Sequence, residues 1–387
     1  MKRLYLTSVP VAWALTYCVA SAVSAQNTRL GPEVCGTAWH RVPSPSPAHQ
    51  SGDANQLSGV AVFSATDAWA VGWSLSFSGL GYKTLAEHWD GTRWSVVPTA
   101  NTAMRNNTLR AVSVLAPDDV WAVGQQDDGS GNAMTLVEHW DGYRWRVDPS
   151  ATVPGSLGAV IAFSSTDVWV SGFVLEHWDG TRWTVTDIGA ANYLGSLVGS
   201  SRDLWAAGYR TIQPFGPVLT LSYHWDGAAW TAHRAVDPLT DSTDDEDVLV
   251  GMTVAPGDTH PWAVGYFADF DGGPPAHTLV EQWDGAKWNR VRAPNPGGAS
   301  LDNELFAVEA RSPSDVWVVG TIGSDGSSNN QTLILRWDGT GWTVTPNTGT
   351  GVLVGIGGDR ATGNLWAVGY SAETNYQGTL ILASCGL

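Results

Sequence analysis

Two phrases decide the fold of this chain, DVWAVG at residues 119–124 and TLVEHWDGYRW at residues 135–145. The first phrase, or a close variant of it, recurs seven times, with its tryptophan at Trp69, Trp121, Trp169, Trp205, Trp262, Trp317 and Trp366. The second phrase follows each of the first six copies, with its first tryptophan at Trp89, Trp140, Trp178, Trp225, Trp283 and Trp337. Copies spaced in this way indicate one structural unit that is repeated along the chain.

Each unit is predicted to form four short strands. In the second unit we expect strands over residues 109–115, 120–125, 135–140 and 145–147. Asp141-Gly142 between apolar runs is a strong hairpin signal. Four-stranded units of about 40 to 57 residues are typical of propeller blades, which cannot bury both faces alone and therefore pack in a ring. The sequence predicts an all-β, seven-bladed β-propeller with four antiparallel strands per blade.

The two chain ends are expected to complete the last blade together. The seventh unit has three predicted strands, residues 352–356, 365–370 and 379–384, and then ends. Gly36–Pro43 aligns with Gly91–Pro98, so we expect the N-terminal segment to supply the missing outer strand. Cys35 and Cys385 both occupy the aspartate position of the Asp-Gly turn, which predicts a disulfide between them.

The first 25 residues are typical of a secretory signal. Lys2 and Arg3 precede an apolar stretch, and Val23-Ser24-Ala25 offers small residues for cleavage. We therefore expect a signal peptide at 1–25, a lead-in at 26–34 and the propeller at 35–387, in a secreted, cell-surface or periplasmic protein. No later segment is apolar enough for membrane insertion.

The charge of the chain limits its partners. The formal net charge is −17 at pH 7. This excess disfavours nucleic acid and anionic membrane surfaces. We expect a monomer whose ligand is a protein or a glycan.

The repeated WAVG and Asp-Gly-x-x-Trp phrases resemble two groups of propellers. One is the photosystem-assembly-factor and Asp-box class, and the other is the kelch or galactose-oxidase-like class of secreted propellers. The likeness implies the fold alone, since it lies in blade-building residues. An Asp-box also has Ser or Thr two residues before its aspartate, whereas this chain has His88 before Trp89-Asp90.

Residues present in most blades are predicted to be structural, because their copies are dispersed around the ring. His88, His139, His177 and His224 therefore cannot share one metal ion. The aspartates of the first turn, Asp67, Asp119, Asp167, Asp203 and Asp315, are expected to accept hydrogen bonds from the turn backbone. The paired tryptophans of the second phrase should stack and seal neighbouring blades.

Binding is expected where the repeat varies. The loops between the second and third strands and the connections between blades open on one face and are long and variable, which is where rigid scaffolds usually bind ligands. The residue after the first phrase is aromatic in five units, at Trp73, Phe173, Tyr209, Tyr266 and Tyr370. These rings are candidates to stack on a ligand; the alternative is that they pack beneath their own loops. The third unit has almost no such loop after Gly172, which predicts a notch.

Several loops on this face are acidic, and Ca²⁺ is the one cofactor that they could hold. The candidate ligands are Asp127, Asp128, Asp244, Asp245, Asp247, Asp269 and Asp271. None of the loops matches a complete Ca²⁺-binding motif, so solvated acidic loops are the alternative.

No nucleophile motif, phosphate loop or metal triad is present, so no catalytic residue is predicted. The sequence favours a binding or scaffold protein that recognises another protein. A lectin-like propeller is the alternative, and a polysaccharide-acting hydrolase or lyase on the same face is a second one.

Overall fold

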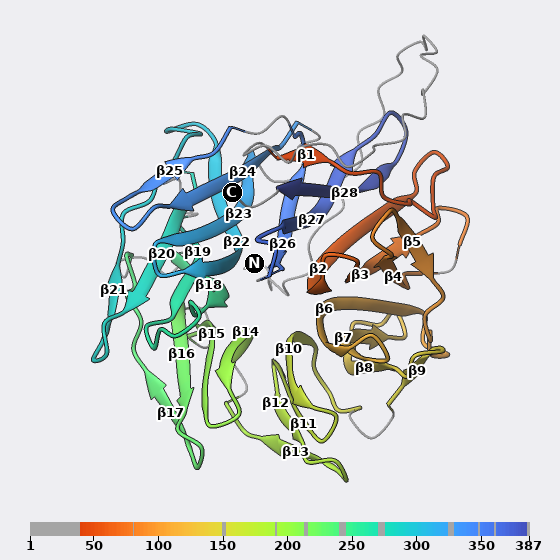
Figure 1. The fold of residues 1–387 in the computed structure, drawn as a ribbon, viewed down its shortest axis with the longest axis horizontal. Coiled ribbons are helices and arrows are strands. Elements are labelled where there is room, and N and C mark those ends of the chain that lie inside the picture. Colours follow the sequence, from red (N-terminus) through yellow and green to blue (C-terminus); the bar gives the residue numbers. More distant parts are fainter. Residues whose placement is uncertain are drawn as a thin grey trace, which may run out of the picture.

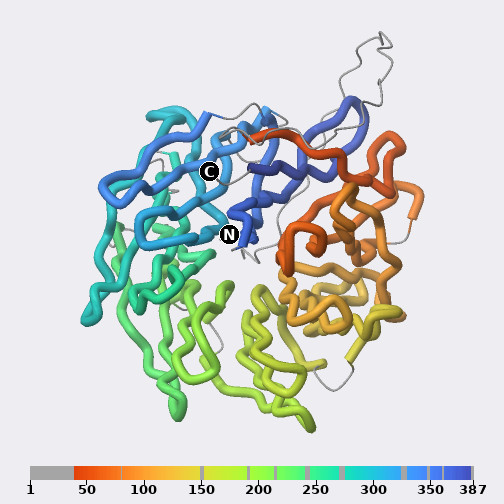
Figure 2. The backbone as a smooth tube through the Cα atoms, viewed as in Figure 1, coloured from red at the N-terminus to blue at the C-terminus, as the bar shows by residue number. Residues whose placement is uncertain are grey.

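The computed structural model describes residues 39–79, 81–148, 152–189, 192–212, 216–239, 245–269, 275–323, 329–346, 349–359 and 361–384. In these residues all regular secondary structure is β-strand, and no helix is present. Small sheets stand around a common centre, and their order follows the chain (Figure 1). The backbone trace passes once around this centre and brings the first and last coloured segments together (Figure 2).

Each repeat forms a unit of four antiparallel strands, and single parallel pairs, Ala54–Gln377 and Val218–Glu246, join two pairs of neighbouring units into eight-stranded sheets. The first three sheets comprise β2 (Ala54–Ser64), β3 (Asp67–Leu75), β4 (Lys83–Trp89) and β5 (Trp94–Val97); β6 (Asn106–Ala116), β7 (Asp119–Asp127), β8 (Met134–Trp140) and β9 (Trp145–Val147); and β10 (Leu157–Ser164), β11 (Asp167–Gly172), β12 (Leu175–Trp178) and β13 (Trp183–Thr186).

The following three sheets are built in the same way. They comprise β14 (Asn192–Ser200), β15 (Asp203–Thr211), β16 (Val218–Trp225) and β17 (Trp230–His233); β18 (Asp245–Thr253), β19 (Trp262–Asp269), β20 (His277–Trp283) and β21 (Trp288–Arg290); and β22 (Asp302–Ser312), β23 (Asp315–Gly323), β24 (Gln331–Trp337) and β25 (Trp342–Val344). The strands predicted for the second repeat are present and extend by up to three residues beyond the expected ends.

The last sheet contains both ends of the described chain. It comprises β26 (Val352–Gly358), β27 (Leu365–Ala372), β28 (Gln377–Ser384) and the short strand β1 (His40–Arg41). His40 is paired with Ala383 and Arg41 with Leu382. The Val42 N–H also donates to the Ile381 carbonyl at 2.9 Å.

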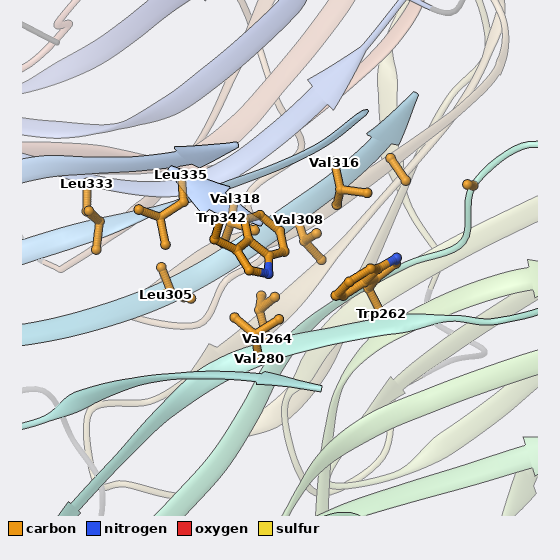
Figure 3. Packing of buried hydrophobic residues seen from close by; sticks show 12 residues of the cluster. Trp262, Val264, Val280, Leu305, Val308, Val316, Val318, Leu333, Leu335 and Trp342 are labelled. Carbon is orange, nitrogen blue, oxygen red and sulfur yellow. The ribbon is translucent and has the colours of Figure 1, made fainter. Parts of the chain in front are cut away.

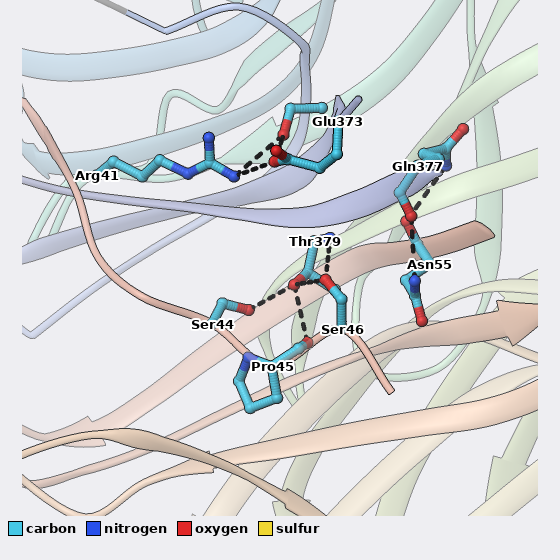
Figure 4. A network of polar contacts seen from close by, with 9 residues as sticks. Arg41, Ser44, Pro45, Ser46, Asn55, Glu373, Gln377 and Thr379 are labelled. Carbon is cyan, nitrogen blue, oxygen red and sulfur yellow. Dashed lines mark hydrogen bonds and ion pairs between the residues drawn. The ribbon is translucent and has the colours of Figure 1, made fainter. Parts of the chain in front are cut away.

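Polar side chains strengthen this meeting of the chain ends (Figure 4). Arg41 forms an ion pair with Glu373 at 2.6 Å, and the Ser44 hydroxyl donates to Thr379 Oγ1 at 2.8 Å. Asn55 Nδ2 donates to the Gln377 carbonyl at 3.0 Å. The predicted signal peptide, the lead-in and the Cys35–Cys385 disulfide lie outside the described residues, so they stay predictions.

The glycine of the first phrase is required by a close approach between strands. A Cβ on Gly124 would lie 2.0 Å from the carbonyl oxygen of Thr108, on the neighbouring strand β6. The register of β6 against β7 shifts just beyond this point, between Leu109 and Ala111. Such a bulge bends the first strand, and only glycine leaves room for its backbone.

Tryptophans interlock each sheet with the next one. Trp69 of β3 has its ring centre 5.1 Å from Trp140 and 5.3 Å from Trp145, which flank the hairpin of the following sheet. The same contact joins Trp121 to Trp183, Trp169 to Trp225 and Trp230, Trp205 to Trp283 and Trp288, Trp262 to Trp337 and Trp342, and Trp366 to Trp89 and Trp94. The predicted sealing role of the paired tryptophans is confirmed.

Apolar side chains fill the rest of each junction, as Figure 3 shows for one of them. Trp262 of β19 meets Trp342 of β25 edge to face, with ring centres 5.6 Å apart. Leu305, Val318 and Leu333 pack in the same cluster and are completely buried. The second strand of each sheet is mostly apolar, because neighbouring sheets cover both of its faces.

At the junction between β23 and the N-terminal segment, Trp39 provides the tryptophan contact that the hairpin tryptophans provide elsewhere. Its ring is 4% exposed and lies 5.7 Å from Trp317. We predict that Trp39→Ala lowers the free energy of unfolding by about 3–5 kcal/mol, because it empties a buried aromatic site. Urea denaturation at neutral pH measures this change.

The control is Tyr143→Ala, which truncates a side chain that is 91% exposed. A change within about 0.5 kcal/mol is expected there. If both variants unfold at the wild-type midpoint, the N-terminal segment does not stabilise the fold.

Candidate functional site

The repeated histidines are structural, as predicted. His139 Nε2 lies 2.8 Å from Asp119 Oδ1, and its ring stacks on Trp121 with ring centres 4.2 Å apart. The other histidines of this position pair with Asp67, Asp167 and Asp203 in the same way. In β24 an arginine replaces the histidine: Arg336 Nε lies 2.9 Å from Asp315 Oδ1, and the guanidinium lies over Trp317.

The first-turn aspartates have a role other than the predicted one. Asp119 Oδ1 accepts a hydrogen bond from the ring N–H of Trp121 at 3.0 Å besides its contact with His139. Asp119 thus links two side chains of its own sheet. The prediction was that it would accept hydrogen bonds from N–H groups of the turn backbone. The aspartates of the Asp-Gly turns do have such donors: Asp90 Oδ1 accepts from the N–H groups of Thr92 and Arg93 at 2.8 and 2.9 Å.

The strand order separates short turns from long loops. In the first sheet, residues 65–66 join β2 to β3, and residues 90–93 join β4 to β5. Strand direction reverses at every turn, so these two connections lie at one end of the sheet. Residues 76–82, between β3 and β4, and residues 98–105, which lead to β6, lie at the other end. We call this second end the long-loop face.

Aromatic side chains of neighbouring sheets lie close together near the long-loop face. Tyr193 of β14 and Tyr209 of β15 are stacked, with ring centres 5.3 Å apart and an angle of 30° between the rings. Phe173, from the preceding sheet, contacts Tyr193 edge to face at 4.9 Å. Tyr193, which the repeat did not indicate, thus joins Phe173 to Tyr209, and a third of the five predicted aromatic residues, Tyr266, lies on the next sheet. We call Phe173, Tyr193, Tyr209 and Tyr266 the aromatic row.

Tyr266 of the next sheet interacts electrostatically with Tyr209 and forms a hydrogen bond with a carboxylate. Its hydroxyl donates to Glu246 Oε1 at 3.1 Å. Burial, together with the charges of Glu246 and Glu304, raises the pKa of Tyr266 well above its usual value. Burial, Tyr193 and Glu246 raise the pKa of Tyr209 to about 12. Both tyrosines stay protonated at neutral pH, next to negative charge.

The short connection after Gly172, where a notch was predicted, lies at one end of the row. Only Phe173 and Val174 connect β11 to β12, and the Gly172 N–H donates to the Val174 carbonyl at 2.8 Å. This tight connection leaves the Phe173 side chain 40% exposed. The first ring of the row is therefore accessible to a ligand.

The other two predicted aromatic residues are separate from the row in the contacts of the described chain. Trp73 packs edge to face on Tyr82, at 4.9 Å, so it covers its own loop as the alternative interpretation expected. Tyr370 lies on β27, opposite Val352, and is partly buried.

The acidic candidates do not form a common cation site in the described residues. There, no three His, Cys, Asp or Glu side chains are placed to hold one metal ion. Asp127 Oδ1 accepts from Asn106 Nδ2 and from the Gly129 N–H, both at 2.7 Å. Asp128 Oδ1 accepts from the Ser130 N–H at 2.8 Å. Calcium binding stays a prediction, because Asp244 and Asp271 lie outside the described residues.

Asp245 and Asp247 were expected in an acidic loop, but this expectation was wrong. Both belong to β18 and are buried, with Asp245 opposite Asp269 of β19. Asp247 Oδ2 accepts the N–H of Leu239 at 3.2 Å. Burial and the nearby Asp237 and Asp245 raise the pKa of Asp247 to about 7. The segment pairs with β19 and therefore forms a strand, although its sequence is polar.

Buried glutamates occupy several junctions between sheets, which the sequence did not predict. Glu87 accepts from the Ser44 hydroxyl at 2.9 Å, and Glu138 accepts from the Ala100 N–H at 3.2 Å. Glu281 accepts from the Val236 N–H at 3.1 Å. Each donor follows the outer strand of the preceding sheet, so these glutamates tie neighbouring sheets together.

A hollow lined by Arg292, Ala293, Pro294, Asn295 and Trp342 lies beside β21 and β25. These are outer strands, and the lining has no carboxylate or histidine. The hollow shares no residue with the aromatic row and offers no chemistry that would make it a second candidate.

Comparison of this chain with known proteins gives information on its fold. No family model and no curated protein matches this chain. Among solved structures, it is similar to one titled "YCF48 bound to D1 peptide", with a TM-score of 0.56 and 15% sequence identity over 92% of this chain and 99% of that chain. This chain is a β-propeller. The resemblance to photosystem-assembly-factor propellers is confirmed for the fold, whereas the kelch likeness stays a prediction.

The described residues contain no helix that is long and apolar enough to cross a bilayer.

The raised pKa of Glu281 makes the stability of the fold depend on pH. Burial raises its pKa from 4.5 to about 8. Between these values the folded chain keeps a proton that the unfolded chain releases, so stability falls as pH rises from about 5 to about 8 and is level above that. We predict that Glu281→Gln, which stays neutral, makes this fall smaller by about 2 kcal/mol.

Urea denaturation across the same pH range measures the difference. Asp118→Asn, which neutralises an exposed side chain, is the control and should keep the wild-type profile. A Glu281→Gln profile parallel to that of the wild type would show that the pKa of Glu281 is the same in the folded and the unfolded chain.

Proposed function

We propose that this chain is an exported, seven-bladed β-propeller that binds another polypeptide on its long-loop face. Contacts between first strands support the blade number: β2 packs on β6, and the series continues through β10, β14, β18, β22 and β26. β26 in turn packs on β2. The pairing of β1 with β28 supports closure of the ring by the N-terminal strand.

The observation that carries the binding proposal is the aromatic row. Its residues come from three neighbouring sheets, and its Phe173 end is exposed at the short connection after Gly172. Rigid aromatic side chains are enriched among the residues that contribute most to protein interfaces. The solved propeller named above has a peptide bound, which supports a polypeptide as the first ligand class to test.

A glycan is the alternative ligand. The exposed ring of Phe173 is the feature that favours it, because sugar rings stack on aromatic faces. A panel of soluble polysaccharides should accompany the peptides in the experiment below, since binding of polysaccharide alone would favour the lectin function.

Export can be tested on the chain expressed with its own first residues in a secreting host. We predict release of a protein that begins at Gln26 and contains a Cys35–Cys385 disulfide. Intact mass and peptide mapping without reduction measure both features. A product that retains Lys2 and Arg3, or that has two free thiols, would contradict the respective part of the proposal.

The binding function can be tested by selection from a random peptide library. We predict that Phe173→Ala weakens binding of the selected peptides by about tenfold, because it removes an exposed aromatic contact. Phe63→Ala is the matched control: Phe63 is 46% exposed but lies in β2 beside the short turn at residues 65–66.

Wild-type affinity is expected for the Phe63 variant. Equal losses in both variants, or peptide binding that is independent of Phe173, would place the binding surface elsewhere. Fluorescence anisotropy with labelled peptides gives the affinities, and thermal unfolding shows that both variants are folded.

A further inference from the structure

The inner end of the aromatic row combines π-faces with carboxylates. Tyr209 comes from β15, and Tyr266 and Glu246 come from the next sheet, on β19 and β18. Val218 of β16 is paired with Glu246, which holds the two sheets together at this point. The backbone pair fixes the position of Glu246 in its strand, and the Tyr266 hydroxyl holds its carboxylate.

From this geometry we infer that the aromatic row binds a basic side chain, Lys or Arg, of the partner polypeptide. Glu246 acts as the counter-charge, and the rings of Tyr193, Tyr209 and Phe173 contact the cation and its apolar stem. This inference rests on the proposed function and specifies the chemistry of the partner. A cation gains from both features, since aromatic faces attract positive charge and a nearby carboxylate adds to this attraction.

The electrostatics of the site agree with a cationic ligand. Glu246 and Glu304 both disfavour a phenolate at Tyr266, so both carboxylates act on this ring from nearby. Arg110 of β6 contributes positive charge near Tyr209 and donates to Gln125 Oε1 at 3.4 Å. The net charge of −17 acts at longer range and speeds the approach of a basic partner.

One end of the row is accessible. The two-residue connection at Phe173 and Val174 leaves Phe173 40% exposed. Gly158 lies beneath Tyr193, where a Cβ would be 2.2 Å from its hydroxyl. The absence of a side chain at Gly158 lets Tyr193 lie across β10, toward Phe173. The apolar stem of a Lys or Arg can pack on such rings while its charged end stays free to meet a carboxylate.

The test uses the tightest-binding peptide from the library selection. That peptide is resynthesised with Lys, Arg or the neutral isostere norleucine at its basic position. We expect the Lys and Arg forms to bind about tenfold more tightly than the norleucine form, and this preference to weaken at high salt.

Glu246→Gln should remove most of this preference, because it keeps the size of the side chain and loses its charge. Asp118→Asn removes the same charge at the short turn between β6 and β7 and should keep the preference. Tyr266→Phe, which deletes the hydrogen bond to Glu246, should weaken binding of the Lys form more than that of the norleucine form. Thermal unfolding verifies that each variant is folded.

The outcomes separate this inference from the proposed function. Peptides that require Phe173 but contain no basic residue, or that bind equally well with norleucine or to the Glu246→Gln variant, overturn the inference and leave the binding function in place. If no peptide is selected at all, both proposals fail.

Discussion

The fold depends on tryptophans that reach from one sheet into the next. A four-stranded sheet of this size has two apolar faces and too few residues to cover either of them itself. Trp69 and its equivalents solve this problem, since each one contacts the tryptophans of the following hairpin, at 5.1 and 5.3 Å in the case of Trp69. The indole ring is large, so each of these contacts buries substantial apolar area. Neighbouring sheets thereby cover faces that a single sheet would expose.

Polar groups inside the repeat serve the same structural purpose. His139 and Asp119 align the Trp121 ring, and Arg336 shows that another cation can replace the histidine. Buried glutamates accept hydrogen bonds from the chain that leaves the preceding sheet, as Glu281 does from Val236. These groups are recurrent, buried and committed to neighbours. Chemistry directed at a ligand therefore has to come from residues that occur once.

Tyr193 and Glu246 have this character, whereas Phe173, Tyr209 and Tyr266 occupy a position that is aromatic in five units. Phe173 is exposed because the loop after Gly172 is short, and Tyr193 lies over Gly158 because that position lacks a side chain. Glu246 meets Tyr266 within one sheet, while Tyr209 belongs to the sheet before it. The site thus combines a recurrent aromatic position with residues that occur once.

The strands, their turns and the sealing tryptophans could be predicted from the sequence, because each follows from a local pattern that recurs with the repeat. The spacing of Trp140 and Trp145 around Asp141-Gly142 is sufficient to place both rings on one hairpin. Three-dimensional packing was needed to show that Tyr193 joins Phe173 to Tyr209, that Glu246 lies beside Tyr266, and that Asp247 is buried in a strand. These contacts join residues of different strands and sheets, and their geometry is set by packing around the ring, which no local pattern encodes.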